Sequence, residues 1–273
     1  MKIPRFDSAF VREWEQQYYR CEESHADERE YHELIKATQE DIARTGTISK
    51  DMLRRILKWK DRRERVERKV IWERYEIIYE PRFRLIIGES VPDHHKMLVL
   101  IWSETELRDK LPVGAGLLDS VRGKAHGFGI PVASTVLHFI YPDTFPIIDI
   151  RTAEALYLFD QLGSTDRSKH SVYTQFCSKL LETATKTGHS LHTIDRALFA
   201  FHEQLLQLAM YEECKQWGFE LGYSGQGIGK GLPLDAPRKF RQMIISRIKE
   251  AARNKTQFDS PSEFTPSERI IPM

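Results

Sequence analysis

The chain of 273 residues has little cysteine and no long apolar run. Its three cysteines, Cys21, Cys177 and Cys214, are widely spaced and odd in number, which excludes an iron–sulfur cluster or a structural zinc site held by cysteines alone. No apolar stretch approaches the length that spans a bilayer, and the first residues carry no signal-peptide core. We therefore expect a cytoplasmic protein with no membrane partner.

The chain also lacks a strong overall charge, because its net charge is only +1. The charges are nevertheless unevenly spread. Residues 1–41 hold 11 acidic and 6 basic side chains, whereas residues 54–74 hold 10 basic and 4 acidic ones and residues 238–255 hold 7 basic side chains and Glu250. Two such basic segments could bind a polyanion, and they could equally be ordinary solvated helix faces.

Most of the chain shows the spacing of apolar residues that is typical of helices, and no set of partner strands is visible. The sequence therefore predicts an all-α fold. Residues 256–273 contain three prolines and little apolar periodicity, so we expect a flexible tail there. The predicted helices include residues 8–42, 52–59, 96–109, 132–140, 152–162, 172–187, 191–208 and 211–219, and a last basic helix begins at Pro237.

A glycine hairpin stands in the middle of the chain, at Gly127-Phe128-Gly129. Glycines two residues apart allow a tight turn and a close approach to a ligand. Pro131 suits the first turn of a following helix, whose free N–H groups attract an anion. Lys124 and His126 would add positive charge. A short Gly-x-Gly match is also common in ordinary turns, so alone it favours a phosphate clamp only weakly.

A single acidic residue, Asp149, follows 18 residues after Pro131, inside the apolar run Ile147-Ile148-Asp149-Ile150. Apolar neighbours desolvate a carboxylate, which suits a residue that stabilises positive charge. The same residue could simply cap the helix that follows it. The two roles are compatible, because a carboxylate that is fixed by helix N–H groups is also held in one direction.

Together the hairpin, Pro131 and Asp149 resemble the helix-hairpin-helix, Gly/Pro–Asp superfamily of DNA glycosylases, over roughly residues 117–155. This resemblance implies two helical lobes around a cleft that binds DNA and the base, with a helix-hairpin-helix motif on the DNA backbone. We expect residues 1–255 to form this helical domain. Residues from about 50 to 155 would form the central lobe, and the N- and C-terminal helices would form the other.

The resemblance also implies a mechanism. The target nucleotide is flipped out of the duplex, and Asp149 stabilises the positive charge that develops on its sugar. Arg151 corresponds to a residue that contacts a nearby phosphate. Family members that also cut the strand carry a lysine just after the hairpin, where this chain has Pro131. The resemblance therefore implies a monofunctional enzyme that leaves an abasic site and has no lyase activity.

The expected site residues fall into three groups. The chemistry falls to Asp149 alone. No metal or other cofactor is expected, although the hairpin carbonyls of relatives can hold a monovalent cation. The partner is double-stranded DNA, and no obligatory protein partner is evident. The expected DNA-binding residues are Lys124, His126, Gly127, Gly129 and Arg151, and the base pocket or cleft is assigned to Pro131, Ser134, Thr135 and Trp59, the last of which could equally pack in the core.

The identity of the excised base stays open, because the shape of the pocket determines it. An alkylated base in DNA repair is one possibility. A hypermodified bacteriophage base such as glucosylated hydroxymethylcytosine is another, suggested by stand-alone bacterial members of the family, and it would make the protein an antiviral defence enzyme. Two further readings are a helix-hairpin-helix module that binds DNA without chemistry, and a helical interaction protein with no nucleic-acid role.

Overall fold

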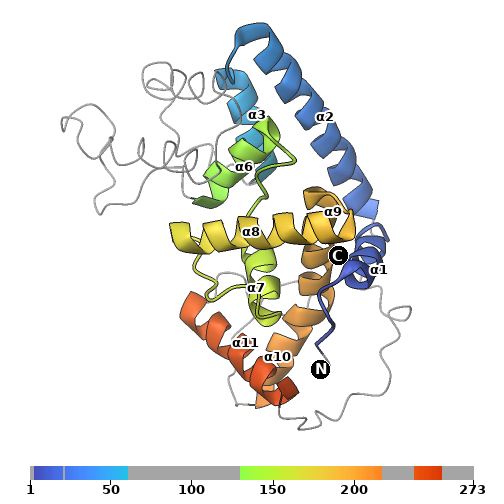
Figure 1. The fold of residues 1–273 in the computed structure, drawn as a ribbon, viewed down its shortest axis with the longest axis vertical. Coiled ribbons are helices and arrows are strands. Elements are labelled where there is room, and N and C mark those ends of the chain that lie inside the picture. The colour runs from blue at the N-terminus through green and yellow to red at the C-terminus, as the bar shows by residue number, and fades with distance from the viewer. Residues whose placement is uncertain (1–2, 21, 61–129, 217–236, 254–273) are drawn as a thin grey trace, which may run out of the picture. The chain divides into compact units, whose positions relative to one another are not determined.

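The computed structural model describes residues 3–20, 22–60, 130–216 and 237–253, and every regular element among them is a helix (Figure 1). The predicted all-α class is therefore confirmed for the described part of the chain. Several predicted features lie outside the described residues: the helix at 96–109, most of the basic segment 54–74, the tail at 256–273, and the hairpin with Lys124, His126, Gly127 and Gly129.

The chain divides into two compact units. The first unit consists of Met1–Tyr18, Ile150–Asp166 and Thr193–Met273. The second unit consists of Tyr19–Asp149 and Arg167–His192. Each unit has its own packed interior and is described by itself below.

The second unit contains α2 (Glu22–Thr45), α3 (Lys50–Lys60), α6 (Ile130–Ile140) and α8 (His170–Thr187), and the first three pack against one another (Figure 1). The apolar face of α3 is buried, as its spacing predicts. Signals in the sequence set the corner before α3. Gly46 ends α2 with a φ of 68°, and Ser49 Oγ accepts the Met52 N–H at 3.2 Å as the cap of α3.

The first unit contains α1 (Ser8–Tyr18), α7 (Ile150–Leu158), α9 (Leu191–Phe201) from Thr193 onward, the π-helical turn η4 (His202–Leu206), α10 (Gln207–Gln216) and α11 (Arg238–Arg253). Helix α10 packs against both η4 and α11. The interior is rich in aromatic rings. Phe10 lies edge-on to Phe159 and Phe201, with ring centroids 5.1 Å and 5.4 Å apart.

Several predicted helices have different bounds in the structure. The predicted helix 8–42 is divided, because α1 ends at Tyr18 and α2 begins at Glu22. The helix predicted to end at Leu162 ends at Leu158, and Asp160 then turns the chain with a φ of 60°. The predicted break between residues 208 and 211 is absent, since α9, η4 and α10 follow one another without interruption from Leu191 to Gln216, the last residue described there. No described helix has both the length and the apolar character needed to cross a membrane.

Candidate functional site

Helix α6 begins at Ile130, directly after the hairpin sequence, with Pro131 in its first turn as predicted. A proline costs no hydrogen bond there. The Pro131 carbonyl accepts two hydroxyl groups, from Ser134 Oγ at 3.1 Å and from Thr135 Oγ1 at 2.8 Å. Both hydroxyl-bearing residues are buried. Their hydroxyl groups bind the helix backbone, and their proposed contact with a base stays a prediction.

Asp149 stands directly before Ile150, the first residue of α7, and is half-buried. This is the position at which an aspartate caps a helix. The residue before it, Ile148, is buried and donates its N–H to Ser134 Oγ at 3.3 Å. The segment that carries Asp149 is therefore attached to the first turn of α6 through the hydroxyl of Ser134.

The connection from α6 to Asp149 is also held by a neutral hydrogen-bond network in the second unit. His138 Nδ1 lies 2.7 Å from the Phe145 carbonyl oxygen, so it carries the proton and donates. The other ring nitrogen, Nε2, then accepts from the Tyr31 hydroxyl at 2.7 Å. Burial lowers the pKa of His138 to about 3. The imidazole is thus neutral, and it links α2, α6 and the segment before Asp149.

Further contacts fix the same region. The Tyr173 hydroxyl of α8 donates to the Pro146 carbonyl at 3.1 Å. Trp59, a candidate for the base pocket, lies edge-on to Phe139 with ring centroids 5.0 Å apart, and 6.0 Å from Tyr31. Trp59 is half-buried, so these contacts account for packing on one side of the ring. Its place in a base pocket stays a prediction.

Arg151, the predicted phosphate contact, has a carboxylate partner in the first unit. Its Nε donates to Glu203 Oε1 at 2.5 Å, and its guanidinium carbon lies 4.8 Å from the centre of the Phe199 ring. Burial would raise the pKa of Glu203, but the nearby His202 and the Arg151 charge hold this pKa below its usual value. The carboxylate is therefore ionised at neutral pH. Sequence reasoning missed Glu203, which lies 52 residues from its partner.

Glu203 belongs to the turn η4, where it follows the buried His202. His202 Nε2 donates to Glu154 Oε2 at 2.8 Å, and Nδ1 lies 3.4 Å from Glu203 Oε1. Glu154 also accepts two bonds from Arg241, at 2.7 Å and 2.6 Å. Burial would raise the pKa of Glu154, but Arg241 and His202 hold this pKa below its usual value. A row of ionisable groups thus runs from the buried Arg241 to the partly exposed Arg151.

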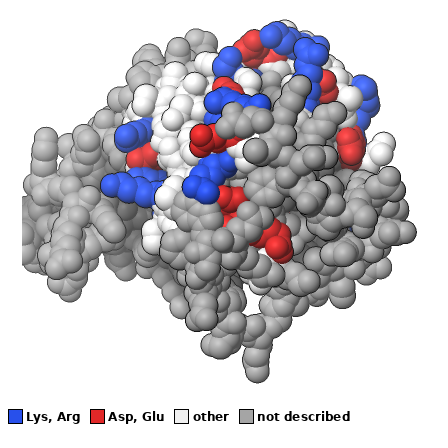
Figure 2. Space-filling model, turned by 90° about the horizontal axis from the view of Figure 1, so that it is seen from below, with Lys and Arg blue, Asp and Glu red and all other residues white. Residues whose placement is uncertain are grey.

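The basic helix α11 binds carboxylates of its own unit. Lys249 Nζ and Arg253 Nη2 lie 2.5 Å and 2.6 Å from the two oxygens of Asp160, and Arg247 Nε lies 2.8 Å from Glu213 Oε1. Figure 2 likewise shows basic and acidic side chains interspersed among the described residues of one face. These three cations of the basic segment therefore form ion pairs within their own unit.

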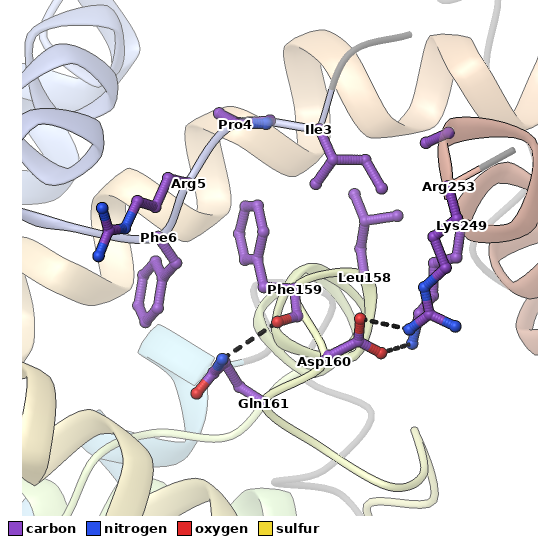
Figure 3. A pocket seen from close by; sticks show the side chains of 11 residues that line it. Ile3, Pro4, Arg5, Phe6, Leu158, Phe159, Asp160, Gln161, Lys249 and Arg253 are labelled. Carbon is purple, nitrogen blue, oxygen red and sulfur yellow. Dashed lines mark hydrogen bonds and ion pairs between the residues drawn. The ribbon is translucent and has the colours of Figure 1, made fainter. Parts of the chain in front are cut away.

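A cavity of about 480 Å³ in the first unit adjoins this cluster (Figure 3). Figure 3 shows the Asp160 carboxylate directed at Lys249 and Arg253, and the apolar side chains of Ile3 and Leu158 line the same cavity. Asp160 serves both cations, so the ion pairs join the end of α7 to the last turn of α11. Within the described residues, no group of three or more His, Cys, Asp or Glu side chains is arranged to hold a metal ion.

Comparison of the chain with family models, with curated proteins and with solved structures finds no match. The resemblance to the glycosylase superfamily accordingly rests on the residues between about 117 and 155. Of these, the described residues bring together Pro131, Ser134 and the segment that ends at Asp149.

Proposed function

We propose that the protein is a monofunctional DNA glycosylase that flips a modified base out of duplex DNA and hydrolyses its N-glycosidic bond. One observation carries the proposal. Asp149 is half-buried at the start of α7, and hydrogen bonds through Ser134 tie its segment to the first turn of the helix that follows the Gly127–Gly129 sequence. A phosphate-binding turn at Gly127–Gly129 and the Asp149 carboxylate would thereby be held at a fixed distance and orientation.

The proposed reaction needs one carboxylate. The bond between C1′ and the base nitrogen breaks, and its electron pair leaves with the base. Asp149 stabilises the positive charge that develops on the sugar. Water adds its hydroxyl to C1′ and passes its proton to Asp149, while the departing base takes up a proton from solvent. The product is an abasic site.

Pro131 supports the monofunctional assignment. A strand-cutting glycosylase needs an amine that forms a Schiff base with the sugar. The corresponding position, in the first turn of α6, carries a proline, which has no nucleophilic side chain. The proposed substrates are an alkylated base or a hypermodified bacteriophage base such as glucosylated hydroxymethylcytosine, and the first experiment distinguishes them.

That experiment is base release from duplexes that carry alkylated, oxidised, deaminated or phage-type hypermodified bases. Each product is analysed before and after alkali, which cuts at abasic sites. We expect breaks only after alkali and on one class of substrate. Asp149→Asn should abolish them. Asp143→Asn is the matched control, since Asp143 is exposed in the turn that precedes the same segment. Base release at the parent rate by Asp149→Asn would refute the assignment.

A non-catalytic DNA-binding module is the second candidate. It is favoured by the position of Asp149 directly before α7, where a carboxylate caps the helix whatever its chemistry. This candidate predicts salt-dependent binding to every duplex and no base release. Asp149→Asn should then change nothing, because asparagine caps helices as well as aspartate does.

A further inference from the structure

The Arg151 guanidinium is held on two sides. Glu203 binds its Nε edge at 2.5 Å, and the Phe199 ring lies 4.8 Å from its central carbon. A guanidinium is planar, so fixing one edge and one face fixes the direction of its remaining N–H groups. The Arg151 side chain is 25% exposed, so part of it is reachable from solvent.

Glu203 is itself attached to the buried core. It is the second residue of η4, and the residue before it, His202, is fully buried and bonded to Glu154. Glu154 is in turn bound by two nitrogens of Arg241, which is also fully buried. The π-helical turn places Glu203 beside this network, and wider turns of this kind are common at functional sites. The backbone that carries the Glu203 carboxylate is therefore attached to the buried core, and the carboxylate can orient Arg151.

We propose that Glu203 is a positioning residue, which holds Arg151 in the direction needed to bind a phosphodiester of the DNA. This inference rests on the proposed function. A preoriented guanidinium loses less side-chain entropy when it binds a phosphate than a free one does. A carboxylate can also compete with a phosphate for the same cation, and Glu203 would then weaken DNA binding. The two effects differ in sign and can be measured.

The test is a double-mutant cycle on binding of the full chain to a labelled duplex that contains a tetrahydrofuran analogue of the abasic product. Arg151→Ala should weaken binding about tenfold, the usual effect of losing a charge-assisted hydrogen bond. Glu203→Ala should weaken it about threefold. The double variant should bind no more weakly than Arg151→Ala alone, since Glu203 acts through Arg151. Glu203→Gln keeps an acceptor for Nε and should recover most of the affinity.

Salt dependence separates positioning from a loss of structure. Arg151→Ala should lower the slope of log affinity against log salt by about one, and Glu203→Ala should lower it in the same direction. A variant that is merely less stable would keep the parent slope. Glu212→Ala is the matched control, because it removes an exposed acid from α10 of the same unit. Circular dichroism and thermal melting would verify that each variant is folded.

Tighter binding by Glu203→Ala than by Glu212→Ala would overturn the inference in favour of competition. Additive losses in the double variant would also overturn it, since Glu203 would then act independently of Arg151. These results leave DNA binding and the proposed function intact. If the folded parent chain binds no duplex at low salt, the proposed function and this inference fail together.

Discussion

The two units differ in the kind of polar group that they bury. The first unit buries ions, with the Glu154–Arg241 pair fully enclosed. The second unit buries neutral groups, with the His138 imidazole between the Tyr31 hydroxyl and the Phe145 carbonyl. Both networks fix a segment that adjoins a proposed functional residue, which is Arg151 in the first unit and Asp149 in the second.

The difference matters because buried ions and buried neutral groups fail differently. A buried ion pair costs much desolvation free energy and depends on both partners, so removal of one partner leaves an uncompensated charge. A neutral network costs less to bury, but it is sensitive to any condition that would charge one of its members. The first unit should therefore be most sensitive to substitution, and the second to acid.

The largest effect is expected for Arg241→Met, which leaves the buried Glu154 carboxylate with His202 alone. The free energy of unfolding should fall by about 3–5 kcal/mol, measured by urea denaturation. Arg253→Met is the control, because both side chains of its pair with Asp160 are exposed, and it should cost less than about 1 kcal/mol. The double variant Arg241→Met, Glu154→Leu should regain part of the loss. Equal costs for Arg241→Met and Arg253→Met would show that the buried ion pair of the first unit is no more sensitive to substitution than an exposed one.

The second effect is a loss of stability in mild acid caused by His138. Its pKa falls from 6.5 to about 3 on folding, so between these values the unfolded chain binds a proton that the folded chain does not. Stability should therefore decrease as the pH falls below 6.5, by about 2 kcal/mol at pH 5. The neighbouring His192 and Lys60 charges act in the same direction. His138→Gln should be less stable at pH 7 but should show a flatter pH profile.

The matched control for this profile is His32→Gln, which alters a histidine whose side chain is 65% exposed. Urea denaturation at pH 7, 6 and 5 would give the free energy of unfolding of the parent chain and of the two variants. The control should keep the parent slope. A parent slope that persists in His138→Gln would show that another group in the chain causes the acid sensitivity.

A smaller effect is expected for Tyr31→Phe, which keeps the ring and removes the hydroxyl that donates to His138. A buried ring nitrogen then lacks a donor, which should cost about 1.5 kcal/mol. Tyr157→Phe in the first unit is the comparison, since its hydroxyl contacts Ser246 at 2.8 Å in a partly buried position. It should cost less. Thermal melting would order the two variants, and the reverse order would show that the neutral network carries little stability.

The sequence predicted local features better than distant pairings. Pro131 is expected in the first turn of a helix, and the structure confirms it, because a proline at this position acts on its immediate neighbours. The π-helical turn leaves no such signal, since one wider turn does not interrupt the apolar spacing. The basic charge of residues 238–255 is plain from the sequence. The acids that bind these cations, such as Asp160 and Glu213, lie far away in the chain and could not be predicted from it.

The candidate site shows the same division. Pro131 and Asp149 were singled out from spacing, and their places at the starts of α6 and α7 agree with it. Arg151 was also predicted, but its partner Glu203 was not, because nothing local connects residues 52 positions apart. Ser134 was expected at a pocket wall. That place stays a prediction, and the Ser134 hydroxyl also links two backbone segments, which no sequence pattern could indicate.

The smallest effect on stability is expected for substitutions that remove two neighbouring hydroxyl groups. The same substitutions should differ in their effect on the rate of base release. Ser134 and Thr135 are both buried and both donate to the Pro131 carbonyl, but only Ser134 also accepts the Ile148 N–H next to Asp149. Ser134→Ala and Thr135→Val should therefore each cost about 1 kcal/mol of stability.

Their effects on the proposed reaction should differ, because only Ser134→Ala removes the hydrogen bond to the residue next to Asp149. A small displacement of a catalytic group lowers rates steeply, so Ser134→Ala should slow single-turnover base release by about tenfold to a hundredfold. Thr135→Val should release base at nearly the parent rate. The measurement uses the duplex on which the parent chain is active, at a temperature at which both variants are folded. Equal rates in the two variants would mean that Asp149 is positioned by its helix alone, without the hydrogen bond to α6.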